Sequence, residues 1–162
     1  MYNKYINNNK YRKTGEPTMT TPKIEKFIKY YQNTAFESSS RTTRKYTSFQ
    51  TKYINVLKDM AERLNSELTV LKGHFEFSAF FENKETGVVI YISIPDVRYT
   101  HKGWMDKVLV RTAKDTKDYR GGQNNWTTLR EMTSYIAWLM KREDNKRIAN
   151  QEKQEQEMKP AS

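Results

Sequence analysis

The sequence contains no cysteine, which excludes cysteine chemistry, and only two histidines, which limits the sites that histidine could form. Without cysteine there can be no disulfide, iron–sulfur cluster, thiolate zinc site or cysteine nucleophile. The lack of disulfides fits a reducing compartment, and we expect a cytoplasmic protein. A zinc site would need both His74 and His101 together with carboxylates that the sequence does not place nearby. We therefore expect no metal and no cofactor.

Long apolar segments and catalytic motifs are also missing. The longest apolar run, Val88 to Ile94, is far shorter than the roughly 20 residues that span a bilayer. No phosphate-cradling P-loop or dinucleotide fingerprint is present. The spacing of Asp96, Asp106, Asp115 and Asp118 matches no acidic nuclease motif. We expect no membrane span, no secretion signal and no enzymatic activity.

Acidic residues are scarce mainly in the N-terminal part of the chain. The whole sequence has 29 Lys/Arg and 19 Asp/Glu, which gives a net charge of +10. Residues 1–60 hold 12 of the cations and only 4 of the acids, whereas the remaining 102 residues hold 17 and 15. Such segregation creates a positive field over one part of the molecule, and this field attracts polyanions. Solubility is the alternative explanation, although solubility does not require segregation.

Composition divides the chain into three parts. Residues 1–20 are rich in Asn, Lys and Tyr and have few aliphatic side chains, which predicts a flexible basic arm. This arm either grips phosphates while its tyrosines stack on bases, or has no role. Residues 21–143 have the patterning of a single α+β domain. Residues 144–162 are a polar tail, either a frayed helix or disordered chain.

Two helices are predicted before any strand. Thr21 followed by Pro22 is a helix-start signal, and it predicts a short helix over about 22–33. A longer helix is predicted over about 42–65, because apolar residues recur there every three or four positions. The polar face of this helix carries Arg44, Lys45, Lys52 and Lys58. That face is either a solvated surface or a surface that faces phosphates.

The period then changes from helical to alternating. Phe75 to Glu82 and Val88 to Ile94 alternate in the manner of half-buried strands, with a turn between them. These segments predict an antiparallel hairpin that ends at Pro95, since a proline cannot donate to the ladder. A third strand is predicted over Lys107 to Ala113. We therefore expect an α+β fold with a three-stranded antiparallel meander, packed by the long N-terminal helix and a C-terminal helix.

A polar loop over residues 114–125 precedes that last helix. Its tripeptide Gly121-Gly122-Gln123 looks like the loop with which release factors hydrolyse peptidyl-tRNA, but a Gly-Gly turn explains it more simply. Thr128 and Glu131 match the capping box that starts a helix. An apolar stripe predicts this helix over about 129–143.

Two surfaces are candidate binding sites. The first is the basic N-terminal half, through Arg41, Arg44, Lys45 and Lys52. The second is the loop before the last helix, with Lys114, Lys117, Tyr119, Arg120, Asn124 and Trp126. Loops on a rigid scaffold often carry binding residues, and these side chains suit stacking and hydrogen bonding. The alternatives are structural: Trp126 packs on Met132, and the Lys and Asp residues pair with one another.

The chain opens with a basic segment that includes Tyr11-Arg12-Lys13, and its third strand and polar loop run from Val110 to Trp126. With these features, the layout over about 42–143 resembles small proteins of phages and conjugative elements, in particular the type II anti-CRISPR proteins. The resemblance implies a stoichiometric inhibitor that docks on a Cas9-type nuclease or its guide-RNA complex. Such docking would block DNA loading or the movement of a nuclease domain. The resemblance implies no particular site residues.

The competing hypothesis is an accessory protein of a mobile element that binds DNA or RNA directly through phosphate contacts. No RNA-recognition motif or compact helix-turn-helix is visible, so sequence-specific base recognition is not expected. A purely structural partner protein is the third possibility.

Overall fold

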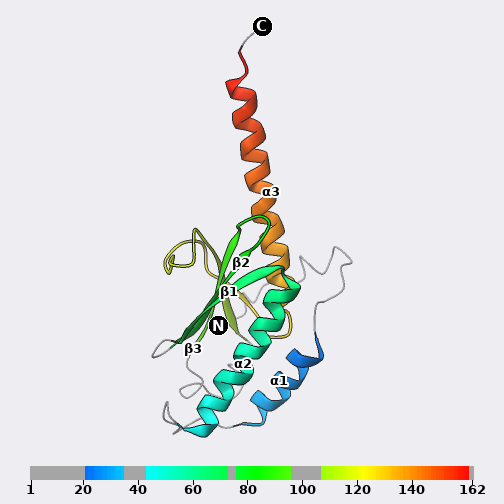
Figure 1. The fold of residues 1–162 in the computed structure, drawn as a ribbon, viewed down its shortest axis with the longest axis vertical. Coiled ribbons are helices and arrows are strands. Elements are labelled where there is room, and N and C mark those ends of the chain that lie inside the picture. Colours follow the sequence, from blue (N-terminus) through cyan, green and yellow to red (C-terminus); the bar gives the residue numbers. More distant parts are fainter. Residues whose placement is uncertain (1–20, 35–42, 73–75, 96–106, 161–162) are drawn as a thin grey trace, which may run out of the picture.

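The computed structural model describes residues 21–34, 43–72, 76–95 and 107–160 (Figure 1). Along these ranges the elements are α1 (Pro22–Gln32), α2 (Arg44–Arg63), β1 (Ser66–Lys72), β2 (Glu76–Asn83), β3 (Val89–Pro95), β4 (Val108–Ala113), β5 (Asn125–Thr127) and α3 (Met132–Met158). The predicted arm of residues 1–20, the candidate Arg41 and both histidines lie outside the described residues. Helices α1 and α2, the β2–β3 hairpin and β4 lie within a few residues of their predicted positions.

The five strands form one antiparallel sheet in the order β1-β2-β3-β4-β5. The α+β class and the sequential strand order agree with the sequence prediction, but the prediction of three strands was wrong. The first missed strand, β1, lies at an edge, where Leu68 and Val70 are only partly buried, so its alternation has little contrast. The second, β5, has three residues, too few to show a period, and it pairs with β4 across the polar loop.

Alternation of side chains gives the sheet two different faces. The core face packs against the helices through nearly fully buried residues that include Phe77, Phe81 and Ile90. The opposite, outer face holds a smaller apolar cluster of Phe80, Val89 and Tyr91. Figure 1 shows the helices on one side of the sheet and the loop between β4 and β5, in yellow, on the other. The domain therefore has a helical layer, a sheet and a loop-covered outer face.

Aromatic packing holds the two N-terminal helices together. α1 starts where Thr21 Oγ1 accepts a hydrogen bond from the Ile24 N–H at 3.2 Å. Phe27 of α1 stacks on Tyr53 of α2, with the ring centroids 5.5 Å apart. Tyr53 in turn meets Phe77 of β2 edge-to-face at 4.9 Å. This series of rings fixes α1 against α2 and α2 against the sheet.

α3 starts later than predicted, and it continues into the polar tail, for which a frayed helix and disordered chain were the two alternatives. The Thr128 hydroxyl accepts a hydrogen bond from the Glu131 N–H at 3.2 Å, as a capping box requires, but this contact closes a turn and the helix begins at Met132. The helix then continues to Met158, so residues 144–158 are helical and almost entirely exposed. Figure 1 shows this part projecting beyond the sheet. None of the helices in the described ranges combines the length and apolar character needed to cross a bilayer.

Candidate functional site

The predicted binding residues form two groups on opposite sides of the sheet. Arg44, Lys45 and Lys52 lie on α2, in the helical layer. The other group follows β4, on the side of the outer face: Lys114, Lys117, Tyr119, Arg120, Asn124 and Trp126. The structure therefore does not bring the nine described candidates into one site.

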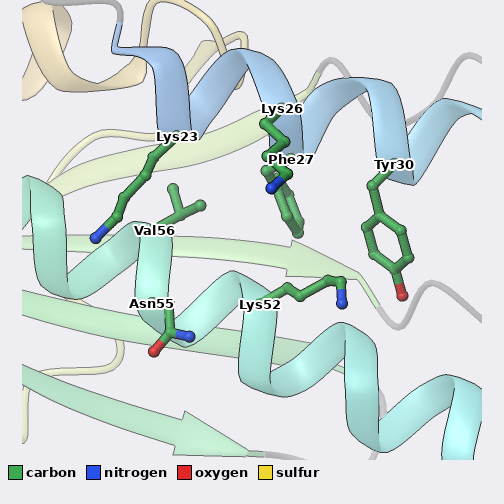
Figure 2. A pocket seen from close by; sticks show the side chains of 7 residues that line it. All are labelled: Lys23, Lys26, Phe27, Tyr30, Lys52, Asn55 and Val56. Carbon is green, nitrogen blue, oxygen red and sulfur yellow. The ribbon is translucent and has the colours of Figure 1, made fainter.

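A basic groove lies between α1 and α2 and encloses a hollow of about 270 Å³ (Figure 2). We call it the lysine groove, and it is lined by Lys23, Lys26, Phe27, Tyr30, Lys52, Asn55 and Val56. Phe27 and Val56 are buried and form its floor, whereas the three lysines are exposed. In Figure 2 the Lys23 side chain reaches from α1 toward α2. Ammonium groups from two helices thus surround one apolar-floored hollow.

Tyr30 and Ser48 hold Lys52 in position at one end of the groove. Lys52 Nζ lies 4.9 Å from the centre of the Tyr30 ring, a cation–π contact. The same Nζ atom donates a hydrogen bond to Ser48 Oγ at 3.4 Å. Burial raises the pKa of Tyr30, and a hydrogen bond with Ser48 partly offsets that rise. The phenol is therefore neutral at physiological pH, and its ring contacts the ammonium group.

The positive charge of the lysine groove is not balanced locally. Among the described residues, none that lines the groove is acidic. The acid of α1, Glu25, is engaged elsewhere, because Arg130 Nε and Nη2 donate to its two carboxylate oxygens at 2.7 and 3.1 Å. This bidentate pairing holds the pKa of Glu25 below its ordinary value. An anion in the groove would relieve the mutual repulsion of its lysines.

Of the three described α2 candidates, only Lys52 lines the groove. Lys45 precedes Lys52 by seven residues, about two helical turns, so it lies on the same side of α2. Arg44 lies further round the helix, away from α1. Sequence reasoning did not select the other polar lining residues, Lys23, Lys26, Tyr30 and Asn55. The sequence did contain a signal for Lys23 and Lys26. They are three residues apart, which puts them on one face of a helix.

Acidic side chains hold the polar loop between β4 and β5 in shape. The Asp118 carboxylate accepts hydrogen bonds of 2.7 to 3.2 Å from three backbone N–H groups, those of Lys114, Arg120 and Gly121. These donors hold the pKa of Asp118 below its ordinary value. Asp115 Oδ1 likewise accepts from the Lys117 N–H at 2.8 Å. Both carboxylates are thus engaged by the backbone of their own loop.

The Gly121-Gly122 pair has a backbone role in the same loop. Gly122 has a φ of +79°, and a Cβ atom there would clash with the carbonyl oxygen of Thr112. A Cβ atom on Gly121 would clash with the Asp118 carboxylate. The left-handed backbone at Gly122 and the close approach of Thr112 and Asp118 therefore give both glycines a structural role.

The loop packs onto the outer face through Tyr119 and Arg111. Tyr119 meets Phe80 edge-on, with the ring centroids 5.7 Å apart, and Phe80 contacts Tyr91 at 5.1 Å. The Arg111 guanidinium carbon lies 4.4 Å from the centre of the Tyr91 ring. Arg111 Nη2 donates to the Tyr119 carbonyl oxygen at 2.5 Å. One tyrosine and one arginine therefore fix the loop over the small apolar cluster.

Trp126 lies on the same outer face. It pairs with Leu109 across the β4–β5 ladder, and Leu109 packs against the outer cluster. Directly opposed residues in a ladder lie on the same side of a sheet. Met132, the alternative packing partner for Trp126, is fully buried in the core on the other side. Trp126 is 46% exposed and Tyr119 is 51% exposed, so both rings remain accessible.

Within the described ranges, no group of three or more His, Cys, Asp or Glu residues is placed to hold a metal ion. No protein-family model, curated protein or solved structure matches the chain. The two surfaces are therefore interpreted from their own chemistry.

Proposed function

We propose that this protein binds nucleic acid through its phosphate backbone and that the lysine groove makes the contacts. The observation that carries the proposal is the convergence of Lys23, Lys26 and Lys52 around a hollow whose described lining has no acid. Phosphate oxygens accept hydrogen bonds from ammonium groups whatever the base sequence. The groove therefore supports affinity for nucleic acid without recognition of particular bases.

A polyanion matches this surface better than a small anion does. Helices α1 and α2 together contain eight Lys/Arg and three Asp/Glu residues. Two of these acids are already paired, Glu25 with Arg130 and Asp59 with Arg63, whose Nε lies 3.1 Å from the Asp59 carboxylate. The cations extend along both helices beyond the groove. A nucleic-acid backbone meets such an extended set with successive phosphates, and each neutralised phosphate releases counterions.

The proposal predicts that affinity depends on the groove lysines and not on net charge alone. A triple variant, Lys23→Gln, Lys26→Gln and Lys52→Gln, removes the charge of the groove. A matched control, Lys84→Gln, Lys153→Gln and Lys159→Gln, removes the same charge from exposed positions outside both α1 and α2. Fluorescence anisotropy with labelled duplex DNA, at several salt concentrations, measures both.

We expect the groove variant to bind at least roughly ten-fold more weakly. The slope of log affinity against log salt concentration should also be smaller in magnitude by about 2 to 3. The control should stay close to the wild type in both respects. All six lysines are exposed, so thermal unfolding of the two variants should be unchanged. Equal weakening in both variants would assign the affinity to net charge and contradict the proposal.

Inhibition of a Cas9-type nuclease is a narrower hypothesis, in which guide RNA on the nuclease complex supplies the phosphates. It is based on the resemblance in layout and composition, and the positive groove agrees with it in charge. A cleavage assay with guide-loaded nuclease tests it. Inhibition at equimolar protein, lost in the groove variant and kept in the control, would support it. Unimpaired cleavage at a large excess of protein would reject inhibition of that nuclease.

A further inference from the structure

The outer face carries a second set of groups that the lysine groove does not use. Tyr119 and Trp126 are large aromatic residues that remain about half exposed on this face. Lys114, Lys117 and Arg120 are exposed in the adjoining loop. Aromatic rings beside cations are the two components with which proteins bind unpaired nucleotides, since bases stack on the rings and phosphates meet the cations.

The cationic side chains of the loop are exposed to solvent, whereas its acids are hydrogen-bonded to the backbone. Its acids, Asp115 and Asp118, accept hydrogen bonds from backbone N–H groups of the loop itself. Among the described residues, the side chains of Lys117 and Arg120 make no hydrogen bond or ion pair, whereas the charge of Lys114 helps to lower the pKa of Asp118. Two acids of the outer face, Glu67 of β1 and Glu82 of β2, face each other in the half of the sheet away from β5. The end of the face that carries Trp126 is therefore complementary to an anion.

The loop is also preorganised. The Asp118 carboxylate accepts hydrogen bonds from three backbone N–H groups of the loop. Tyr119 packs on Phe80, and Arg111 donates a hydrogen bond to the Tyr119 carbonyl oxygen. Gly122 sits in a left-handed conformation that other residues rarely adopt. A surface that is already ordered loses little conformational entropy when it binds a ligand. This distinguishes the outer face from a merely solvated, charged loop.

The geometry points to the outer face as a binding site for single-stranded nucleic acid. Unpaired bases stack on Trp126 and Tyr119, and the flanking phosphates contact Lys114, Lys117 and Arg120. In a duplex the base faces are already stacked on one another, so this site selects single strands. The inference goes beyond the proposed function, because the site lies on the side of the sheet opposite the lysine groove and uses different residues.

Tryptophan fluorescence and anisotropy with labelled oligodeoxythymidylate of about 15 nucleotides test the site directly. We expect the oligonucleotide to quench the protein fluorescence, because stacking on an indole ring is an efficient quenching contact. Trp126→Ala should remove most of that quenching and weaken binding by roughly ten-fold or more. Trp126→Phe, which keeps a stacking ring, should retain most of the affinity. A duplex of equal length should give little quenching that depends on Trp126.

The groove variant, Lys23→Gln, Lys26→Gln and Lys52→Gln, separates this inference from the proposed function. It should keep the Trp126-dependent quenching even where its affinity for duplex falls. Wild-type affinity of Trp126→Ala for the single strand would overturn the inference and leave the groove proposal untouched. Equal Trp126-dependent quenching by poly-L-glutamate would also overturn it, because the face would then recognise an acidic polypeptide rather than bases.

Discussion

Tyr53 shows how a single residue combines a packing role with an energetic cost. Its ring is fully buried between Phe27, Phe49 and Phe77. Its hydroxyl has no hydrogen-bond partner among the described residues. Burial raises the pKa of this phenol far above its ordinary value, so the group stays neutral. The ring stabilises the α1–α2–sheet contact, whereas the hydroxyl loses its hydration without compensation.

We therefore predict opposite effects for two substitutions of Tyr53. Tyr53→Phe should raise the free energy of unfolding by about 1 kcal/mol, because it removes the unpartnered hydroxyl. Tyr53→Ala should lower it by about 3 to 5 kcal/mol, because it also leaves a cavity. Urea denaturation followed by circular dichroism measures both. A clear loss of stability in Tyr53→Phe would mean that the hydroxyl has a partner outside the described residues.

At the scale of elements, local sequence signals predicted those elements whose own residues contain the pattern. α2 has an apolar stripe over several turns, and one face of the β2–β3 hairpin is apolar at every second residue, so both were predicted. β1 and β5 depend on partners instead. Ser66–Lys72 is a strand because β2 pairs with all seven of its residues. Asn125–Thr127 is a strand because it pairs with β4 once the loop has folded back. Neither pairing can be read from a local period.

The polar loop between β4 and β5 should respond to acid through Asp118. Its pKa is below the ordinary value of 3.8, since backbone N–H donors favour the charged form. The stability that it contributes is therefore present above that ordinary pKa and is lost as the pH falls through the lower folded value. We predict an unchanged loop from pH 7 to about 5 and an opened loop in stronger acid.

The chemical shift of the Gly121 amide, measured by NMR, reports this transition because its N–H donates to Asp118. In Asp118→Asn the titration should disappear and the Tyr119–Phe80 contact should weaken at every pH. Asp115→Asn is the matched control, since Asp115 accepts one of the loop N–H groups and Asp118 accepts three. A Gly121 shift that titrates normally in Asp118→Asn would assign the transition to another group.

At the scale of the whole molecule, the lysine groove illustrates what the sequence alone does not reveal. The excess of cations in the first 60 residues indicated which part of the molecule is basic. The groove itself exists because Phe27 stacks on Tyr53 and thereby brings the lysines of α1 beside Lys52 of α2. Likewise, the register of β4 and β5 places Trp126 on the outer face. Both sites are produced by tertiary packing between segments whose separate patterns do not specify it.

The projecting end of α3 is a further whole-molecule feature, because it is helical without burying a core face. Residues 148–158 are exposed throughout. Packing of Met132, Ile136 and Leu139 stabilises the first turns of the helix, whose formation is the unfavourable nucleation step. The Lys, Glu and Gln residues that follow have high helix propensity, so they extend the helix with little loss of free energy. Among the residues that the structure describes, Arg147 makes the last hydrogen bond from α3 to the body, since its Nη1 donates to the Thr86 carbonyl oxygen of the β2–β3 turn at 2.8 Å. Beyond Arg147 the helix should contribute little to the stability of the fold.

We predict that a chain ending at Arg147 keeps the thermal midpoint of the full chain to within about 2 °C, since exposed surface residues contribute little. The residues removed carry three acids and two lysines, so affinity for nucleic acid should be unchanged or slightly higher. Circular dichroism at 222 nm should fall in proportion to the lost helix. Arg147→Ala in the full chain is the control and should lower the midpoint more than the truncation does, because it breaks a contact with the β2–β3 turn. A truncated protein that melts much earlier, or that loses affinity for nucleic acid, would show that the projecting helix contacts the body or the ligand.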